Sequence, residues 1–187
     1  MGILNLDFNL NLRPKKEIAG SYLDYCERAL YPRPFPKQVE MANWAFDHKD
    51  EPRLILGARG YGKTDYVTIN GSGFKLLNDR QYKILLITKE NERGKEIVAE
   101  IREGLAQNGV KFANRAKKKI RIVGCRGKED NFTALTIRSK GIRGRHPNLI
   151  IMEDPITPED TSETERRRVK KVYEELANGK LQLEVVQ

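Results

Sequence analysis

Short apolar runs and amphipathic stretches alternate along most of the chain. Apolar runs, which are typical of buried strands, occur within 53–58, 82–88 and 148–154, and the segment 180–187 is predicted to be one more strand. Between these runs, apolar residues recur at helical spacing at about 37–48, 91–107 and 162–178. Because strands alternate with helices, we predict an α/β fold in which a mainly parallel central sheet is flanked by helices.

Three further stretches have weaker patterns. The segments 119–125 and 132–139 alternate like half-exposed strands and are predicted to form a hairpin. Two glycines within 70–73 predict a short helix, because each costs about 1 kcal/mol relative to alanine in a helix interior. Residues 1–36 have little periodicity and are interpreted as a lead-in that packs on the core, whereas 37–187 form the main domain.

Composition adds constraints on the partners. A chain of 187 residues with 39% hydrophobic and 33% charged residues is typical of one globular domain. The formal net charge of +9 favours a polyanionic partner. The sequence contains no apolar run near the roughly 20 residues that span a bilayer, so we predict no membrane association.

The stretch GARGYGKT follows the first predicted strand and leads into a helix. It satisfies the phosphate-loop pattern G-x-x-x-x-G-K-[ST] in full, and its residues are Gly57, Ala58, Arg59, Gly60, Tyr61, Gly62, Lys63 and Thr64. The glycines allow positive φ, so that successive N–H groups point at phosphate oxygens. Lys63 is predicted to reach the β- and γ-phosphates, and the Thr64 hydroxyl is a hard oxygen ligand for Mg²⁺.

A phosphate loop also requires a carboxylate site on a neighbouring strand. The stretch LIIMEDP supplies four apolar residues followed by Glu153 and Asp154. One of these carboxylates can hold Mg²⁺ through water while the other orients the attacking water. The residues alone therefore predict a nucleoside triphosphatase that depends on Mg²⁺.

These motifs resemble the ATPase domain of the large terminase subunit, the DNA-packaging motor of tailed phages. The resemblance covers about 35–176 and is carried by GARGYGKT, by ILLITKENERGKEIVAEI and by KGIRGRHPNLIIMEDP. It implies a P-loop NTPase fold of the ASCE/RecA-like type.

The resemblance also implies individual roles. Gln38 would contact adenine, Arg59 would act on the γ-phosphate in cis, and Arg143 would be an arginine finger for the neighbouring subunit. Glu153 would be the acid on the magnesium side and Asp154 the catalytic carboxylate. Glutamate precedes aspartate here, in the reverse of the family's usual order, so the division of roles between them stays open.

The partners implied by the resemblance are double-stranded DNA, the portal protein and the small terminase subunit. The implied assembly is a ring-shaped homo-oligomer, a pentamer, in the host cytoplasm and transiently docked on the procapsid. The family's coupling motif and C-terminal nuclease domain have no counterpart in the sequence, so we expect an isolated ATPase domain or a truncated gene product.

Two alternatives differ in class. A helicase-like DNA-dependent ATPase shares the phosphate loop but needs a second motor domain. A nucleotide-binding assembly module with little hydrolysis is compatible with the missing coupling motif. The basic runs 115–121 and 165–171 suit DNA phosphates, although solvated surfaces explain such runs more often.

Overall fold

A six-stranded, mainly parallel sheet forms the centre of the protein in the computed structural model, which describes residues 21–47, 53–55, 60–142, 145–154, 162–177 and 182–186. The strands are β1 (Arg53–Ile55), β2 (Ile84–Thr88), β3 (Lys119–Ile120), β4 (Phe132–Thr136), β5 (Leu149–Glu153) and β6 (Gln182–Val186). Their order across the sheet is β1-β6-β5-β2-β4-β3, and β3 alone among them is antiparallel to its neighbour. The predicted α/β fold is therefore confirmed.

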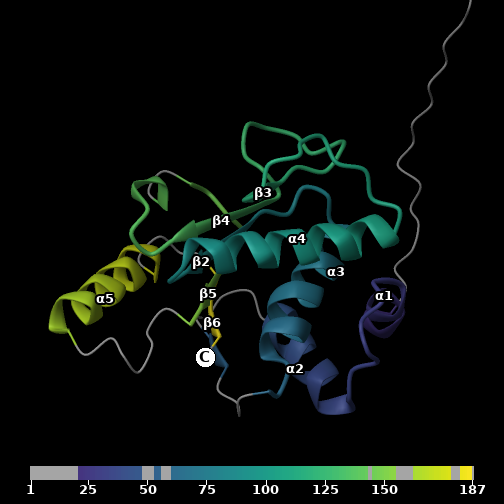
Figure 1. Cartoon of the computed structure of the whole chain (residues 1–187), viewed down its shortest axis with the longest axis horizontal. Coiled ribbons are helices and arrows are strands. Elements are labelled where there is room, and N and C mark those ends of the chain that lie inside the picture. Colours follow the sequence, from purple (N-terminus) through teal and green to yellow (C-terminus); the bar gives the residue numbers. More distant parts are fainter. Residues whose placement is uncertain are drawn as a thin grey trace, which may run out of the picture.

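Helices cover the sheet on both faces. They are α1 (Tyr22–Arg28), α2 (Pro36–Asp47), α3 (Asn70–Asn78), α4 (Asn91–Gln107) and α5 (Glu163–Ala177), with a π-helical turn at Thr64–Ile69 and a 3₁₀ turn at Lys140–Ile142. Figure 1 shows α4 running across the strands, with α3, α2 and α1 gathered near one another and α5 at the opposite side of the view. No helix in the described part of the chain is long and apolar enough to cross a bilayer.

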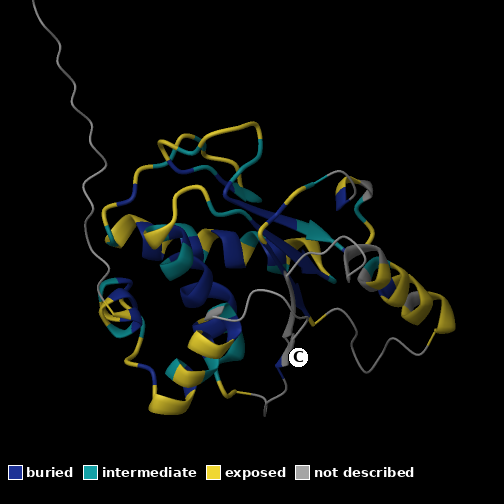
Figure 2. Ribbon diagram, turned by 180° about the vertical axis from the view of Figure 1, so that it is seen from behind, coloured by how far each residue is buried: buried dark blue, intermediate teal, exposed yellow. Residues whose placement is uncertain are grey.

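The alternation of side chains along the central strands divides the core into two layers. Ile84 and Leu86 pack with α1, α3 and α4 in the larger layer, whereas Leu85 and Ile87 pack with Ile142 and with α5 in the smaller one. Figure 2 shows the central strands and the inward side of α4 as buried, while the outward side of α4 is exposed. Strands buried on both faces explain the continuous apolar runs in the sequence.

The helix after the phosphate loop is longer than predicted, because the two glycines do not end it. The π-helical turn at Thr64–Ile69 continues directly into α3. A Cβ at Gly71 would lie 2.4 Å from the Phe46 ring, and one at Gly73 would lie 1.8 Å from the Tyr25 hydroxyl oxygen. The glycines therefore allow two aromatic side chains to approach the helix backbone, and this packing outweighs their local cost.

The predictions for the lead-in and for the hairpin of β3 and β4 agree with the structure only in part. The lead-in contains α1, whose Tyr22, Tyr25 and Cys26 are buried in the larger core layer. The antiparallel pairing of β3 with β4 is confirmed, but β3 has only two residues and the first three residues of β4 are buried. The prediction of half-exposed strands was wrong for β4, since it also pairs with β2 inside the sheet.

The close approach at Gly73 predicts an unusual cost for alanine. We expect Gly73→Ala to lower the free energy of unfolding by about 2 kcal/mol, the usual size of an overpacking effect, although alanine is the better helix former. Chemical denaturation monitored by circular dichroism measures this change. Gly141→Ala is the control, because a Cβ there meets nothing within 4 Å, and Tyr25→Phe should recover part of the loss. Equal stability of Gly73→Ala and wild type would contradict the packing argument.

Candidate nucleotide and magnesium site

The candidate site lies at the carboxyl ends of the parallel strands β1, β5 and β2. Ile55 of β1 is in register with Val186 of β6, and Val186 is in register with Glu153 of β5. Glu153 is in turn level with Thr88, the last residue of β2. Because β6 separates β1 from β5, the ends of these two strands are about 10 Å apart, twice the spacing of neighbouring strands. The last residue of β1, which precedes the phosphate loop in sequence, and Glu153 at the end of β5 therefore lie at the same edge of the sheet.

The described half of the phosphate loop depends on glycine. Gly60 and Gly62 have φ values of +79° and +77°, a conformation that favours glycine. At Gly62, a Cβ would also lie 2.7 Å from a ring carbon of Tyr66. Both the backbone conformation and the available space therefore require glycine at position 62.

Gln38 joins the phosphate loop to the segment before α2. Its side chain is buried, at 7% exposure. The Nε2 group donates to the Tyr61 carbonyl oxygen at 2.9 Å, and Oε1 accepts from the Phe35 backbone N–H at 2.8 Å. One end of the amide thus contacts the phosphate loop, and the other end contacts the residue just before α2.

Lys63 and Thr64 lie where the loop becomes a helix. Lys63 already has helical backbone angles, with φ −56° and ψ −51°, and Thr64 begins the π-helical turn. The first N–H groups of a helix lack partners within it and carry partial positive charge. This end of the helix is therefore suited to bind phosphate oxygens.

The carboxylate of Glu153 is held by two hydroxyl groups of that helix. Thr64 donates a hydrogen bond to its Oε1 atom, and Thr68 donates one to Oε2 at 2.6 Å. Glu153 is 3% exposed and Thr68 is fully buried. The phosphate-loop helix and the acidic strand are thus directly connected.

The environment of Glu153 acts on its pKa in opposing directions. Burial raises the pKa of this carboxyl, and the neighbouring Asp154 charge adds to the increase. The hydrogen bonds from Thr64 and Thr68 and the charge of Arg93 lower the pKa, but the net shift is upward. A nearby cation would favour the ionised form of such a carboxylate.

Asp154 differs from Glu153 in both exposure and backbone conformation. Its side chain is exposed, and its φ of +41° lies in the left-handed region that few residues other than glycine adopt. The chain turns sharply there as it leaves β5. Two adjacent carboxylates therefore have different surroundings, one buried between hydroxyls and the other open to water.

The residues present fit Mg²⁺ bound together with a nucleotide. The described residues include no group of three or more His, Cys, Asp or Glu side chains that could hold a metal ion by themselves. Magnesium in nucleotide sites takes one or two protein oxygens, with phosphate oxygens and water as the other ligands. The Thr64 hydroxyl and the Glu153 carboxylate are hard oxygen donors in direct contact, which meets this requirement.

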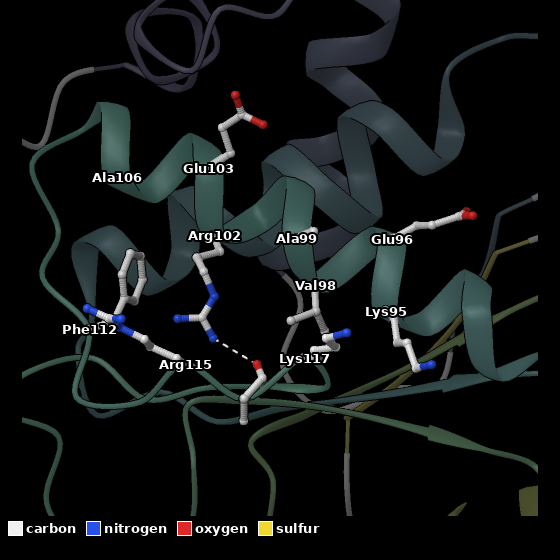
Figure 3. A pocket seen from close by; sticks show the side chains of 11 residues that line it. Lys95, Glu96, Val98, Ala99, Arg102, Glu103, Ala106, Phe112, Arg115 and Lys117 are labelled. Atoms are coloured by element: carbon white, nitrogen blue, oxygen red, sulfur yellow. Dashed lines mark hydrogen bonds between the residues drawn. The ribbon is translucent and has the colours of Figure 1, made fainter.

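A separate hollow of about 660 Å³ lies between α4 and the segment that follows it. Its lining includes Val98, Ala99 and Phe112, with Arg115 and Lys117 at one side (Figure 3). The guanidinium of Arg102 crosses it and donates to the Ala116 carbonyl oxygen at 3.0 Å. The lining ends at Lys117, just before β3, and β3 is the outermost strand on the side of the sheet away from β1.

The structure brings together several of the residues predicted from the motifs. The loop and the start of its helix contain Gly60, Tyr61, Gly62, Lys63 and Thr64, the end of β5 and the residue after it are Glu153 and Asp154, and Gln38 of α2 contacts the loop. Gly57, Ala58, Arg59 and Arg143 lie outside the described residues. Sequence reasoning missed Thr68, although its position four residues after Thr64 in a predicted helix was a usable signal, because such residues share one helix face.

Comparisons with known proteins identify chains that have a similar fold. No protein-family model matches the chain, and no curated protein matches it in sequence. The solved structures that match include the large terminase ATPase domain of Thermus phage P74-26, with a TM-score of 0.58 and 15% identity over 88% of this chain and 68% of that one.

Two further solved structures, both of bacteriophage proteins, match the chain. The N-terminal domain of the DNA packaging ATPase from bacteriophage phi29 matches with a TM-score of 0.53 and 12% identity, over 79% of this chain and 76% of that one. The HK97 bacteriophage large terminase matches with a TM-score of 0.56 and 16% identity, over 88% of this chain and 36% of that one. The resemblance predicted from the motifs is thus confirmed in the fold: this chain is similar in fold to the ATPase domain of a phage large terminase.

Proposed function

We propose that this protein is the ATPase part of a DNA-packaging motor and hydrolyses ATP with Mg²⁺. The observation that carries the proposal is the contact between the Thr64 hydroxyl and the Glu153 carboxylate. It joins the end of a phosphate loop to the end of an acidic strand across the sheet. The shared fold with terminase ATPase domains supports the packaging role.

In this proposal each side chain at the sheet edge has one task. The N–H groups from Gly60 to Gly62 and the ammonium of Lys63 hold the phosphates of ATP. Thr64 and Glu153 hold Mg²⁺, which when bound neutralises charge that develops on the phosphate oxygens.

Asp154 is assigned to the attacking water. An exposed carboxylate can accept a hydrogen bond from water and then its proton, whereas both oxygens of Glu153 already accept hydrogen bonds from threonines. The difference in exposure between the two acids therefore favours Glu153 on the magnesium side and Asp154 as the catalytic carboxylate.

The remaining assignments concern specificity and the assembly. Adenine recognition by Gln38 would exchange one of its present hydrogen bonds for one to the base, and would thereby link base binding to the loop. Arg59 is proposed to act in cis on the γ-phosphate, and Arg143 in trans on a neighbouring subunit.

The proposed partners are double-stranded DNA, the portal protein and the small terminase subunit. The proposed assembly is a pentameric ring docked on the procapsid in the host cytoplasm. A helicase-like ATPase would displace one strand of a duplex, whereas a packaging motor moves along intact duplex, so a strand-displacement assay separates the two. Steady-state ATPase activity separates either motor from an assembly module.

Lys63→Ala tests whether the loop binds phosphate. We expect affinity for a fluorescent ATP analogue with Mg²⁺ to fall about 10- to 100-fold, because a charge-assisted hydrogen bond is worth about 1.5–3 kcal/mol. Lys111→Ala removes an exposed lysine after α4 and is the charge-matched control. Unchanged affinity in Lys63→Ala would mean that the glycine-rich segment is only a turn.

Glu153→Gln and Asp154→Asn should differ in kind. Asp154→Asn should keep nucleotide affinity and lose turnover by about 100-fold or more, the usual contribution of a general base. Glu153→Gln should chiefly raise the Mg²⁺ concentration required for binding. Nucleotide titrations at several Mg²⁺ concentrations, combined with single-turnover hydrolysis, distinguish the variants. Exchanged phenotypes would reverse the two assignments.

Mixed subunits test the role of Arg143. An arginine supplied in trans is worth about 10³–10⁵ in rate, so a monomer should bind ATP but hydrolyse it slowly. Arg143→Ala should preserve binding and reduce only the concentration-dependent activity. Mixing Arg143→Ala with Asp154→Asn subunits should recover part of the ATPase activity. No recovery at any ratio, with both variants folded and assembled, would exclude a finger in trans.

A further inference from the structure

Thr68 has a contact that the phosphate-loop motif does not explain. It follows the motif by four residues, its side chain is fully buried, and its hydroxyl donates to Glu153 Oε2 at 2.6 Å. Thr64 donates to the other oxygen of the same carboxylate. With both oxygens engaged, the plane of the carboxylate is fixed relative to the helix.

The surroundings of Thr68 show that its hydroxyl is costly without this contact. The adjacent residues Val67 and Ile69 are at most 1% exposed, and both belong to the larger core layer. A buried hydroxyl without a partner costs roughly 1–3 kcal/mol in proteins, and valine has nearly the same shape as threonine. The Glu153 carboxylate is therefore the physical reason for a hydroxyl at this position.

The two threonines differ in their access to a ligand. Thr64 is half-buried at the start of the helix, whereas Thr68 lies one turn deeper and has no exposed surface. The oxygen of Thr64 is consequently the one that a bound metal ion can share. Thr68 is the donor that continues to hold Glu153 when the bond to Thr64 changes.

We propose that Thr68 is a positioning residue, which fixes the Glu153 carboxylate beside Thr64 and so prepares the magnesium site before nucleotide binds. The proposal rests on the proposed function of this site. It assigns to Thr68 no contact with the metal or the nucleotide. Thr68 would therefore change the Mg²⁺ concentration that nucleotide binding requires.

Variants of Thr68 in the full chain test this proposal. The measurements are the affinity for a fluorescent ATP analogue in EDTA and the Mg²⁺ concentration that gives half of the Mg²⁺-dependent gain in affinity. Thr68→Val should raise that concentration about tenfold, the effect of losing one hydrogen bond to a charged group, and leave the affinity in EDTA unchanged. Thr68→Ser retains the hydroxyl and should stay within about twofold of wild type.

Two controls separate the hydrogen bond from packing. Thr68→Ser and Thr68→Ala both lack the γ-methyl group and differ in the hydroxyl, so their comparison remains valid even if Thr68→Val does not fold. Thr133→Val alters a buried threonine near the start of β4, whereas the candidate site lies where the strands end. This variant should leave the Mg²⁺ dependence unchanged. Equal impairment of the serine and alanine variants would overturn the proposal, as would a wild-type Mg²⁺ dependence in Thr68→Val.

Parallel variants of the proposed ligands distinguish failure of this inference from failure of the function. If Thr64→Val and Glu153→Gln lose the Mg²⁺ dependence while Thr68→Val and Thr68→Ala keep it, the positioning role is wrong and the magnesium site stands. If none of these variants changes the Mg²⁺ dependence, the proposed function itself is wrong.

Discussion

The carboxylate of Glu153, buried between two threonine hydroxyls, connects the two halves of the candidate site. Burying a charge is costly unless hydrogen bonds or an opposite charge compensate it. Here the compensation comes from the helix that follows the phosphate loop. The strand that supplies the acid and the helix that begins at the loop are consequently held in one arrangement, although β6 lies between β5 and β1.

Adjacent acids in one sequence can perform different chemistry when their surroundings differ. Glu153 ends a strand that is buried on both faces, and Asp154 begins the sharp turn after it. One residue of displacement along the chain therefore moves a carboxylate from the interior to the solvent. A buried carboxyl group with a raised pKa beside an exposed carboxylate is a recurrent arrangement by which proteins give two acids different roles.

Much of the candidate site could be predicted, because its residues lie in short, contiguous patterns. The glycines and lysine of the loop and the acids after an apolar run identify both halves without knowledge of the fold. The place of β6 could not be read in this way, because strand order depends on pairing between distant segments. The glycines of α3 were misread for a related reason, since the aromatic rings of Tyr25 and Phe46 that require them belong to other helices. Thr68 was missed because its partner lies 85 positions away in sequence.

The position of β6 also has a consequence for the order of folding. It follows every other described strand in sequence, yet it is the neighbour of both β1 and β5 in the sheet. Pairings between such distant segments form late, because a long loop must close first. During synthesis, β1 gains its described neighbour only when residues 182–186 have left the ribosome. The strands around the candidate site are therefore complete only once residues 182–186 have been made, and earlier intermediates expose the edge of β5.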